Sequence, residues 1–197
     1  MVRKGKGPKV EIRLPPVLKK AKRGPSVMLP KDLGLIIGYT CLGKGSVVVE
    51  AGAGSGFSGI VLGRIARKVV SYERKEEFAK LAQENCRRAG LKNVKVRPAD
   101  IIDGIKEKDV DLVLLDMPEA EKAVGHAHKA LKTGGHVVGY LPNVEQAKEF
   151  YLECEKKGFA PVFMLEGIVR EYEVRDFGVR PKHVGLMHTG YLVFGRK

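Results

Sequence analysis

The chain alternates between short apolar runs and longer segments in which apolar residues recur every three or four positions. Runs rich in valine, isoleucine and leucine are typical of buried strands, and the longer spacing is typical of helices with one buried face. The pattern predicts strands at 46–51, 69–73, 93–98, 109–116 and 135–141, and helices at 57–67, 75–89, 119–131 and 144–157. Such regular alternation predicts a parallel sheet covered by helices.

The last part of the chain breaks this alternation. Two more predicted strands, 159–174 and 185–195, follow the last helix with no helix between them. Strands that follow one another in this way can pair antiparallel, so we expect a late hairpin at one side of the sheet. The 197 residues, 44% of them hydrophobic, suffice for one core of normal size. We therefore expect an α/β, Rossmann-like fold with a mostly parallel seven-stranded sheet and a C-terminal antiparallel hairpin.

A glycine-rich loop follows the first predicted strand. The valines at 47–49 lead to an acidic residue, and glycines then stand at alternate positions directly before a helix. Glycines allow a tight turn and let a ligand approach the backbone closely. A dinucleotide fingerprint that begins at Gly52 needs glycine or alanine at position 57, where this chain has phenylalanine. The loop therefore favours S-adenosylmethionine. Its expected binding residues are Gly52, Gly54, Ser55, Gly56 and Phe57.

Acidic residues stand at the carboxyl ends of four successive predicted strands: Glu50, Glu73, Asp100 and Asp116. These ends meet at one edge, where open α/β sheets bind ligands. Because gathered carboxylates repel one another, they favour a polar or cationic ligand. We expect Glu50 to orient the methionine amino end, Glu73 to bind the ribose and Asp100 to bind the adenine amine, with Asp100 also a helix N-cap. A parallel sheet with such an edge and a late hairpin resembles the class I S-adenosylmethionine-dependent methyltransferases.

The formal net charge of +13 is concentrated near the N-terminus. The first 44 residues contain eleven lysines and arginines but two acidic residues. Residues 1–25 also contain prolines and glycines, a composition that is not expected to fold alone. We expect a basic, flexible arm at 1–25 and a methyltransferase domain at 26–197. A basic arm beside a nucleoside site indicates a nucleic acid partner, and a tail that only keeps the protein soluble is the alternative.

Other features limit the compartment and the chemistry. No apolar run is long enough for a membrane span, and the basic N-terminus lacks the apolar core of a signal peptide. Cys41, Cys86 and Cys154 are scattered, as buried thiols of a cytosolic protein are. His126 and His128 lie on different faces of a predicted helix, so we expect no metal site. The expected localisation is cytoplasmic, without a membrane partner.

Four segments resemble a known family. They are KRGPSVMLPKDLGLIIGY at 22–39, VVVEAGAGSG at 47–56, LLDMPE at 114–119 and RPKHVGLMHTGYLVF at 180–194. Together they resemble the tRNA (adenine-N1)-methyltransferase family of archaea and bacteria, which modifies adenosines in the T loop. The most specific pieces are Pro-Lys-Asp at 30–32, Asp-x-Pro at 116–118 and His-Thr-Gly-Tyr at 188–191. The resemblance implies S-adenosylmethionine as donor, tRNA as the RNA partner and a homo-oligomer, either a dimer or a tetramer.

Roles for individual residues follow from the same resemblance. Asp116 is the expected catalytic residue: its carboxylate would accept a hydrogen bond from the exocyclic amine of adenine, offset the positive charge that develops as N1 is alkylated, and help remove the proton. Arg180, His188 and Tyr191 are assigned to the substrate side by the resemblance alone.

The chain departs from the family in three places. Leu29 stands where an aromatic residue tends to precede Pro-Lys-Asp, and Glu121 stands where the aspartate motif commonly has tryptophan. A short basic segment replaces the small β-rich domain that members usually carry before the arginine-glycine pair. Because flipped bases stack on aromatic side chains, the substrate base is expected to differ or to be held by Phe57, Tyr140 or Tyr191.

Two alternative functions stay open. A small-molecule methyltransferase that resembles the precorrin methylases would need no RNA-binding domain, but it has no need of Asp-x-Pro as an amine acceptor. A non-catalytic RNA-binding or assembly subunit would keep the fold while Asp116 became dispensable.

Overall fold

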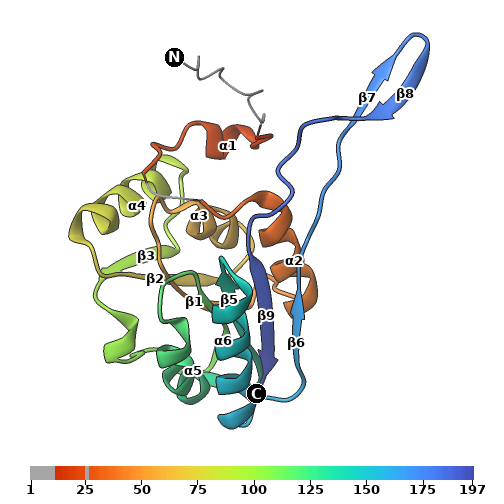
Figure 1. Cartoon of the computed structure of the whole chain (residues 1–197). Helices are drawn as coiled ribbons and strands as arrows, with labels where there is room; N and C mark the ends of the chain where they lie inside the picture. The colour runs from red at the N-terminus through yellow and green to blue at the C-terminus, as the bar shows by residue number, and fades with distance from the viewer. Residues whose placement is uncertain (1–11, 25–26) are drawn as a thin grey trace, which may run out of the picture.

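The computed structural model describes residues 12–24 and 27–197. A seven-stranded sheet forms its centre, with the strand order β3-β2-β1-β4-β5-β9-β6 (Figure 1). Its strands are β1 (Val47–Ala51), β2 (Lys68–Glu73), β3 (Val94–Pro98), β4 (Val110–Leu115), β5 (Leu131–Leu141), β6 (Val162–Leu165) and β9 (Tyr191–Arg196). The neighbouring strands β3, β2, β1, β4 and β5 pair parallel with one another, and β9 pairs antiparallel with β5 and β6. The predicted mostly parallel sheet with a late antiparallel pair is confirmed.

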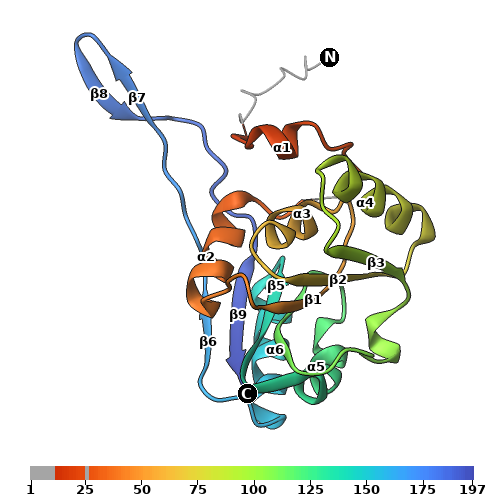
Figure 2. The same ribbon diagram turned by 180° about the vertical axis from the view of Figure 1, so that it is seen from behind.

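Helices cover both faces of this sheet (Figure 2). One core contains residues of α1 (Pro16–Lys19), α2 (Pro30–Thr40), α3 (Phe57–Gly63) and α4 (Glu76–Arg88). The other contains residues of η1 (Ile101–Asp103), η2 (Ala120–Ala123), α5 (Val124–Ala130) and α6 (Val144–Lys156). In β1, Val48 belongs to the first core and Val49 to the second. Alternate side chains of one strand point to opposite faces, so a continuous valine run fills both layers.

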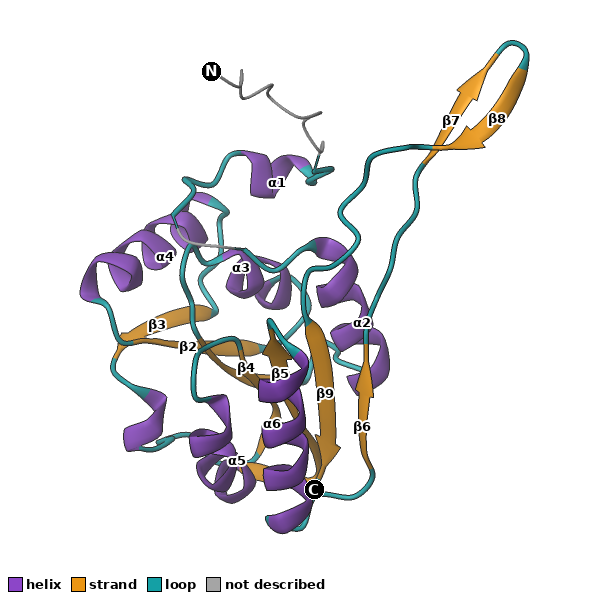
Figure 3. Ribbon diagram, viewed as in Figure 1, coloured by secondary structure: helices purple, strands orange, loops and turns teal. Residues whose placement is uncertain are grey.

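The C-terminal strands are shorter than the pattern predicted. The predicted strand 159–174 is wrong as one element, because β6 pairs with β9 only from Val162 to Leu165. The chain then leaves the sheet and forms a separate antiparallel hairpin of β7 (Tyr172–Arg175) and β8 (Gly178–Pro181). Figure 3 shows this hairpin projecting well beyond the helices and the sheet. The predicted strand at 185–195 begins only at Tyr191, where pairing with β5 starts.

Two further boundaries differ from the prediction. The helix expected at 119–131 is divided into η2 and α5, and β5 begins directly at Leu131. The apolar spacing of this segment suited one helix, but a left-handed residue, Glu119, precedes a 3-10 turn. Neither α1 nor α2 was predicted. Pro30 begins α2, and Leu33 and Ile36 are fully buried on its inner face. These residues carry a helical signal that the sequence reading overlooked.

Part of the basic arm packs against the domain. Leu18 of α1 is 1% exposed and belongs to the same core as Phe57. Residues 1–11 lie outside the described residues, so the predicted flexible arm stays a prediction. Within residues 12–24 and 27–197, no helix is both long enough and apolar enough to cross a bilayer.

Gly52 locks the carboxyl ends of β1 and β4 together. The Asp116 N–H donates to the Ala51 carbonyl oxygen at 2.9 Å, which continues the pairing of the two strands past their ends. Gly52 has φ +85°, and a Cβ placed on it would lie 1.8 Å from the Asp116 carbonyl oxygen. Only a residue without a side chain allows this approach.

We expect Gly52→Ala to destabilise the fold much more than Gly90→Ala. Gly90 is the matched control because its φ is +78° but an added Cβ meets nothing within 4 Å. Both changes carry the cost of a left-handed alanine, about 1–2 kcal/mol. Gly52→Ala must also separate β1 from β4, so urea unfolding should show a further loss of about 2 kcal/mol or more. Equal losses for the two variants would contradict the proposed steric constraint.

Candidate active site

The glycine loop is held from below by β2 and Glu73. The Gly52 N–H donates to the Tyr72 carbonyl oxygen at 3.1 Å, and the Gly54 N–H donates to Glu73 Oε2 at 3.0 Å. The other carboxylate oxygen of Glu73 accepts from the Lys75 N–H at 3.0 Å. A carboxylate has about four acceptor positions, so Glu73 retains capacity for ligand hydroxyls. The structure thus brings Glu73 and the loop together, as the sequence predicted.

The upper half of the loop packs on α4. Gly56 has φ +76° and precedes α3, and a Cβ on it would lie 3.0 Å from both Cα and the carbonyl oxygen of Ala82. Phe57 is 2% exposed and belongs to the core beneath the loop. Its side chain is therefore closed to a ligand, which corrects the expectation that Phe57 could provide a stacking surface for the base.

Glu50 is enclosed below the loop. It is 2% exposed, and its Oε1 accepts from Ser71 Oγ at 2.5 Å. Burial raises its pKa, and hydrogen bonds from Ser71 and Ser58 offset part of this rise. A Cβ on Gly59 would lie 2.8 Å from Glu50 Oε1, so the helix backbone closes over the carboxylate. The predicted contact with the methionine amino end stays a prediction.

Asp100 is the N-cap of η1. Its side chain accepts from the Ile102 N–H at 3.0 Å, and it is partly buried after β3. The N-cap role that the sequence indicated is confirmed. A second role toward an adenine amine stays a prediction, for which the remaining lone pairs of the carboxylate suffice.

Asp116 stands at the end of β4, partly buried at the same edge. Burial and, to a smaller extent, the nearby charge of Glu50 together raise the pKa of its carboxyl to about 7. A carboxyl with a pKa near neutrality can accept and release a proton at physiological pH. Such a strongly shifted group at a ligand-binding edge is a candidate acid or base.

Sequence reasoning missed a buried polar cluster beside Asp116. Asp32 is fully buried, and its carboxylate accepts from Lys31 Nζ at 2.7 Å and from Thr189 Oγ1 at 2.9 Å. Lys31 Nζ also donates to Thr189 Oγ1 and to the Gly167 carbonyl oxygen, both at 2.6 Å. The pKa of Tyr140 is raised to about 12 by burial and then by Asp32 and Asp116, against the effect of a Thr189 hydrogen bond. Tyr140 therefore lies within electrostatic range of both Asp32 and Asp116.

The segment 188–191 joins this cluster to β5 and β9. His188 bonds with Glu166 through Nδ1 at 2.6 Å and with the Pro142 carbonyl oxygen through Nε2 at 3.0 Å. Glu166 raises the pKa of His188, and both ring nitrogens are engaged within the chain. The Tyr191 ring centroid lies 4.8 Å from that of His188. The structure thus brings these two predicted substrate residues together, while their contact with substrate stays a prediction.

Gly190 lets the backbone pass directly over Tyr140. A Cβ on Gly190 would lie 2.7 Å from Cε2 of the Tyr140 ring. The Pro-Lys-Asp and His-Thr-Gly-Tyr motifs therefore meet in space, and their appearance in the same resemblance was the available signal that they act together.

Arg180 is not brought to this site within the chain. It lies on β8 of the projecting hairpin, where its Nε donates to Glu173 Oε2 at 3.0 Å. It lines a groove of about 960 Å³ between the hairpin stalk, the start of α2 and the segment before α1. The basic residues along this groove are Arg13, Lys31, Arg170, Arg180, Lys182 and His183.

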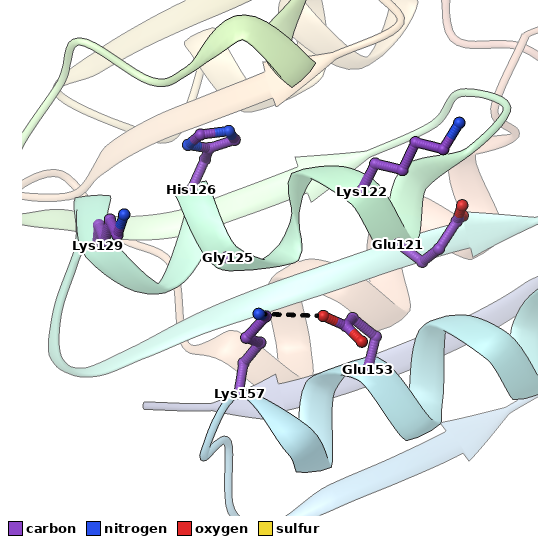
Figure 4. A pocket seen from close by; sticks show the side chains of 7 residues that line it. All are labelled: Glu121, Lys122, Gly125, His126, Lys129, Glu153 and Lys157. Atoms are coloured by element: carbon purple, nitrogen blue, oxygen red, sulfur yellow. Dashed lines mark ion pairs between the residues drawn. The ribbon is translucent and has the colours of Figure 1, made fainter.

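A second cavity, of about 420 Å³, lies between α5 and α6. Figure 4 shows that charged side chains from both helices and η2 surround it, with an ion pair between Lys157 and Glu153. None of the sequence-predicted site residues lines this cavity. The glycine loop and Asp116 lie elsewhere, at the carboxyl edge of the sheet.

Comparison with known proteins shows the family of this chain. Residues 22–185 match the family described as tRNA methyltransferase complex GCD14 subunit. This chain belongs to that family. A relative from Methanocaldococcus jannaschii, tRNA (adenine(57)-N(1)/adenine(58)-N(1))-methyltransferase TrmI, is 36% identical over 91% of this chain and 74% of its own. The crystal structure of tRNA (m1A58) methyltransferase TrmI from Aquifex aeolicus, at 32% identity, has a TM-score of 0.85 over 91% of this chain and 73% of that chain.

A more distant structure shows the fold alone. Precorrin 8w decarboxylase from Methanobacterium thermoautotrophicum has a TM-score of 0.77 but 20% sequence identity, over 91% of this chain and 97% of that chain. Fold similarity at this identity says nothing about substrate. With the GCD14 subunit family, the class I fold and the relatives above, the chain is an S-adenosylmethionine-dependent methyltransferase, and the predicted cofactor is confirmed.

The residues at the loop have the chemistry that this cofactor needs. S-adenosylmethionine carries ribose hydroxyls and cationic groups, which carboxylate oxygens bind well. Glu73, Asp100 and Asp116 stand after β2, β3 and β4 and keep acceptor positions for these groups. Gly54 has a positive φ and no side chain, which suits a close approach of a ligand to the loop backbone.

We expect the Asp116 carboxyl to titrate with a midpoint of about 7 in the ligand-free protein. It is therefore neutral below this pH and charged above it. Glu50→Gln removes the neighbouring charge, so it should lower the midpoint while burial keeps it above the ordinary range. The carboxyl carbon shift of Asp116 in NMR, assigned with Asp116→Asn, measures both values. A wild-type midpoint in the ordinary aspartate range would contradict the enclosed environment.

Proposed function

We propose that this chain transfers a methyl group from S-adenosylmethionine to N1 of adenine in tRNA. The observation that carries the proposal is Asp116, a carboxyl with a pKa raised to about 7 at the edge of the glycine loop and within electrostatic range of Tyr140. The names of the relatives from Methanocaldococcus jannaschii and Aquifex aeolicus describe this same reaction. With a tRNA substrate we also propose a cytoplasmic location.

The glycine loop and its acidic neighbours form the proposed donor site. Gly52, Gly54, Ser55, Gly56 and the backbone of Phe57 would line the methionine end, with Glu50 beneath them. Glu73 would accept hydrogen bonds from the ribose hydroxyls. Its carboxylate is already fixed beside the loop, because Oε2 accepts from the Gly54 N–H at 3.0 Å. Asp100 would accept from the adenine amine of the donor. When bound, S-adenosylmethionine supplies a methyl group on a cationic sulfur, which needs little further activation.

Asp116 is the proposed catalytic residue. In its charged form the carboxylate accepts a hydrogen bond from the exocyclic amine of the target adenine. It offsets the positive charge that develops on the base when N1 becomes alkylated, and it then accepts the amine proton. A pKa near 7 suits this exchange, because the group is charged before the transfer and can hold a proton after it.

Tyr140 is the proposed surface for the target base. Its ring is partly exposed, is packed against Gly190 and is tied to Asp32 and Thr189. A ring fixed in this way orders a base at little entropic cost, and stacking on such a ring contributes about 1–3 kcal/mol per base. Tyr140 would thus provide the stacking surface that is missing because positions 29 and 121 hold leucine and glutamate instead of aromatic residues.

The remaining substrate contacts are proposed from the segments around this site. His188 and Tyr191 lie together at the carboxyl end of β5, where they can border the bound RNA. Arg180 lines the basic groove and would contact phosphates. The basic arm would add phosphate contacts, although residues 1–11 lie outside the described residues.

The projecting hairpin is the proposed contact between copies of the chain. An isolated two-stranded sheet has too little core to be stable in water. Yet β7 and β8 expose large apolar side chains: Tyr172 58%, Val174 78%, Phe177 84% and Val179 63%. A second copy of the chain can cover these side chains with the same surface, as two-fold oligomers do. We therefore propose a homo-oligomer, a dimer or a tetramer, that forms through β7 and β8.

We expect Asp116→Asn to abolish most of the methyl transfer without loss of donor binding. The amide keeps the shape of the carboxylate but cannot offset charge or accept the proton, so turnover on tRNA should fall by about 10² to 10⁴. Mass analysis of nucleosides after incubation with labelled donor should identify 1-methyladenosine for the wild type. Calorimetry with S-adenosylhomocysteine should give similar affinities for wild type and variant.

Other results would redirect the proposal. Near wild-type turnover of Asp116→Asn would remove Asp116 from the chemistry. A labelled precorrin in place of RNA would indicate a small-molecule methyltransferase. Donor binding without transfer to any RNA would favour an assembly subunit.

We expect Val174→Ser/Phe177→Ser to reduce the oligomeric mass in solution. The two side chains are the most exposed of the apolar set on the hairpin, so their loss weakens contacts between copies but no core of one copy. Leu152→Ser on α6 is the matched control, since Leu152 is 52% exposed away from the hairpin. Light scattering coupled to size exclusion measures the mass. If the hairpin variant has the same oligomeric mass as the Leu152→Ser control, the hairpin is not the interface.

A further inference from the structure

A short segment before α2 is bonded directly to the glycine loop. We call residues 21–24 the strap. It follows α1 and runs to α4, whose inner face supports the loop (Figure 1). Lys22, Arg23 and Gly24 are exposed to solvent and belong to the basic N-terminal part of the chain. Their backbone, in contrast, bonds to buried groups of the domain.

Asn85 joins the strap to the loop. The Lys22 N–H donates to Asn85 Oδ1 at 3.0 Å, and Asn85 Nδ2 donates back to the Lys22 carbonyl oxygen at 2.8 Å. The same amide nitrogen donates to the Ser55 carbonyl oxygen at 2.9 Å. A fourth bond runs from the Gly24 N–H to Ser55 Oγ at 2.8 Å. Strap, α4 and loop are thus connected through a single asparagine and a single serine.

Because these groups are buried, we expect the hydrogen bonds between the strap and Asn85 to form and break together. Asn85 is 1% exposed and Ser55 is 2% exposed. Both amide hydrogens and the amide oxygen of Asn85 are used by the strap and the loop. If the strap lifts, a buried amide loses two of its three bonds, and unpaired buried polar groups are unfavourable. The loop conformation and the docking of the strap therefore support each other.

Ser55 lies at the centre of the loop that is expected to hold the donor. The residue before it, Gly54, is fixed by Glu73, and the residue after it, Gly56, packs on Ala82. Ser55 is fixed by Asn85 and the strap. Each residue of the loop centre thus has its own support, and the support of Ser55 comes from a segment outside the sheet and its helices.

We propose that Asn85 is a positioning residue for the donor, and that it couples donor binding to the docking of the strap. Asn85 acts through Ser55 and need not touch the ligand. Because such coupling is reciprocal, any partner that holds the strap in place strengthens donor binding by the same factor by which the donor strengthens docking. RNA phosphates on Lys22 and Arg23 are such a partner. This inference rests on the proposed donor site at the glycine loop.

The test compares S-adenosylhomocysteine binding to five full-length proteins by calorimetry. Asn85→Ala removes the connection from α4, and Gly24→Val displaces the strap from outside, because a Cβ at Gly24 already lies 2.8 Å from Leu81 Cδ2 and 3.3 Å from Ser55 Oγ. Asn93→Ala is the matched control, since Asn93 Nδ2 also bridges two carbonyl oxygens, those of Gly63 and Ala66, away from the strap. The fourth protein is the double variant of Asn85 and Gly24, and the fifth is the wild type.

We expect Asn85→Ala and Gly24→Val each to weaken binding about tenfold or more, and Asn93→Ala to leave it within about twofold. The double variant of Asn85 and Gly24 should lose no more than either single variant, since both break the same connection. Hydrogen exchange supplies a second readout. S-adenosylhomocysteine should slow exchange of the Lys22 and Gly24 amides in the wild type, and this protection should vanish in Asn85→Ala.

Several outcomes would overturn the inference. Unchanged affinity in Gly24→Val would show that the strap has no part in donor binding, and it decides the matter even if Asn85→Ala does not fold. An equal loss in Asn93→Ala would show a general loss of stability instead of coupling. If the wild type does not bind S-adenosylhomocysteine, the proposed donor site itself is wrong. If all variants bind it with wild-type affinity, only the coupling is refuted.

Discussion

The contact between Gly52 and the backbone of Asp116 is the constraint on which the rest of the site depends. A Cβ at Gly52 would lie 1.8 Å from the Asp116 carbonyl oxygen, so the ends of β1 and β4 can meet only if that position has no side chain. This contact places the glycine loop directly beside the catalytic candidate. It also sets the position of Gly54, whose N–H reaches Glu73 on β2. The loop, the proposed ribose acceptor Glu73 and the proposed base acceptor Asp116 therefore share one edge.

Burial gives the four acidic residues of this edge different chemistry. Glu50 is enclosed and bonded to Ser71, and Glu73 accepts backbone N–H groups from both sides. Asp100 caps η1. Asp116 is only partly buried, yet burial and then Glu50 raise its pKa to about 7. Residues of the same charge at the same edge thus divide into structural supports, a cap and a group that can exchange a proton near neutral pH.

The other half of the site comes from segments that are far apart in the sequence. Asp32 and Thr189 are separated by 157 residues and bond at 2.9 Å, and Lys31 ties both to the backbone at Gly167. This buried cluster holds the Tyr140 ring against Gly190. A fully paired buried cluster of this kind is rigid, because every broken bond leaves an unpaired polar group. Rigidity here and in the loop is what allows a reaction that consists mainly of alignment.

The sequence by itself determined the parallel sheet, the glycine loop and the edge that carries Glu73 and Asp116, because valine runs, helical spacing and turn glycines are local signals. Only the tertiary structure decided which partners these elements found. In the tertiary structure the Phe57 side chain is buried in the core, and Arg180 lies on β8 of a hairpin outside the central sheet. Residues 159–174 were predicted as one strand, but β6 pairs with β9 at only four positions, from Val162 to Leu165. Pairing and burial depend on distant segments, which a local pattern does not contain.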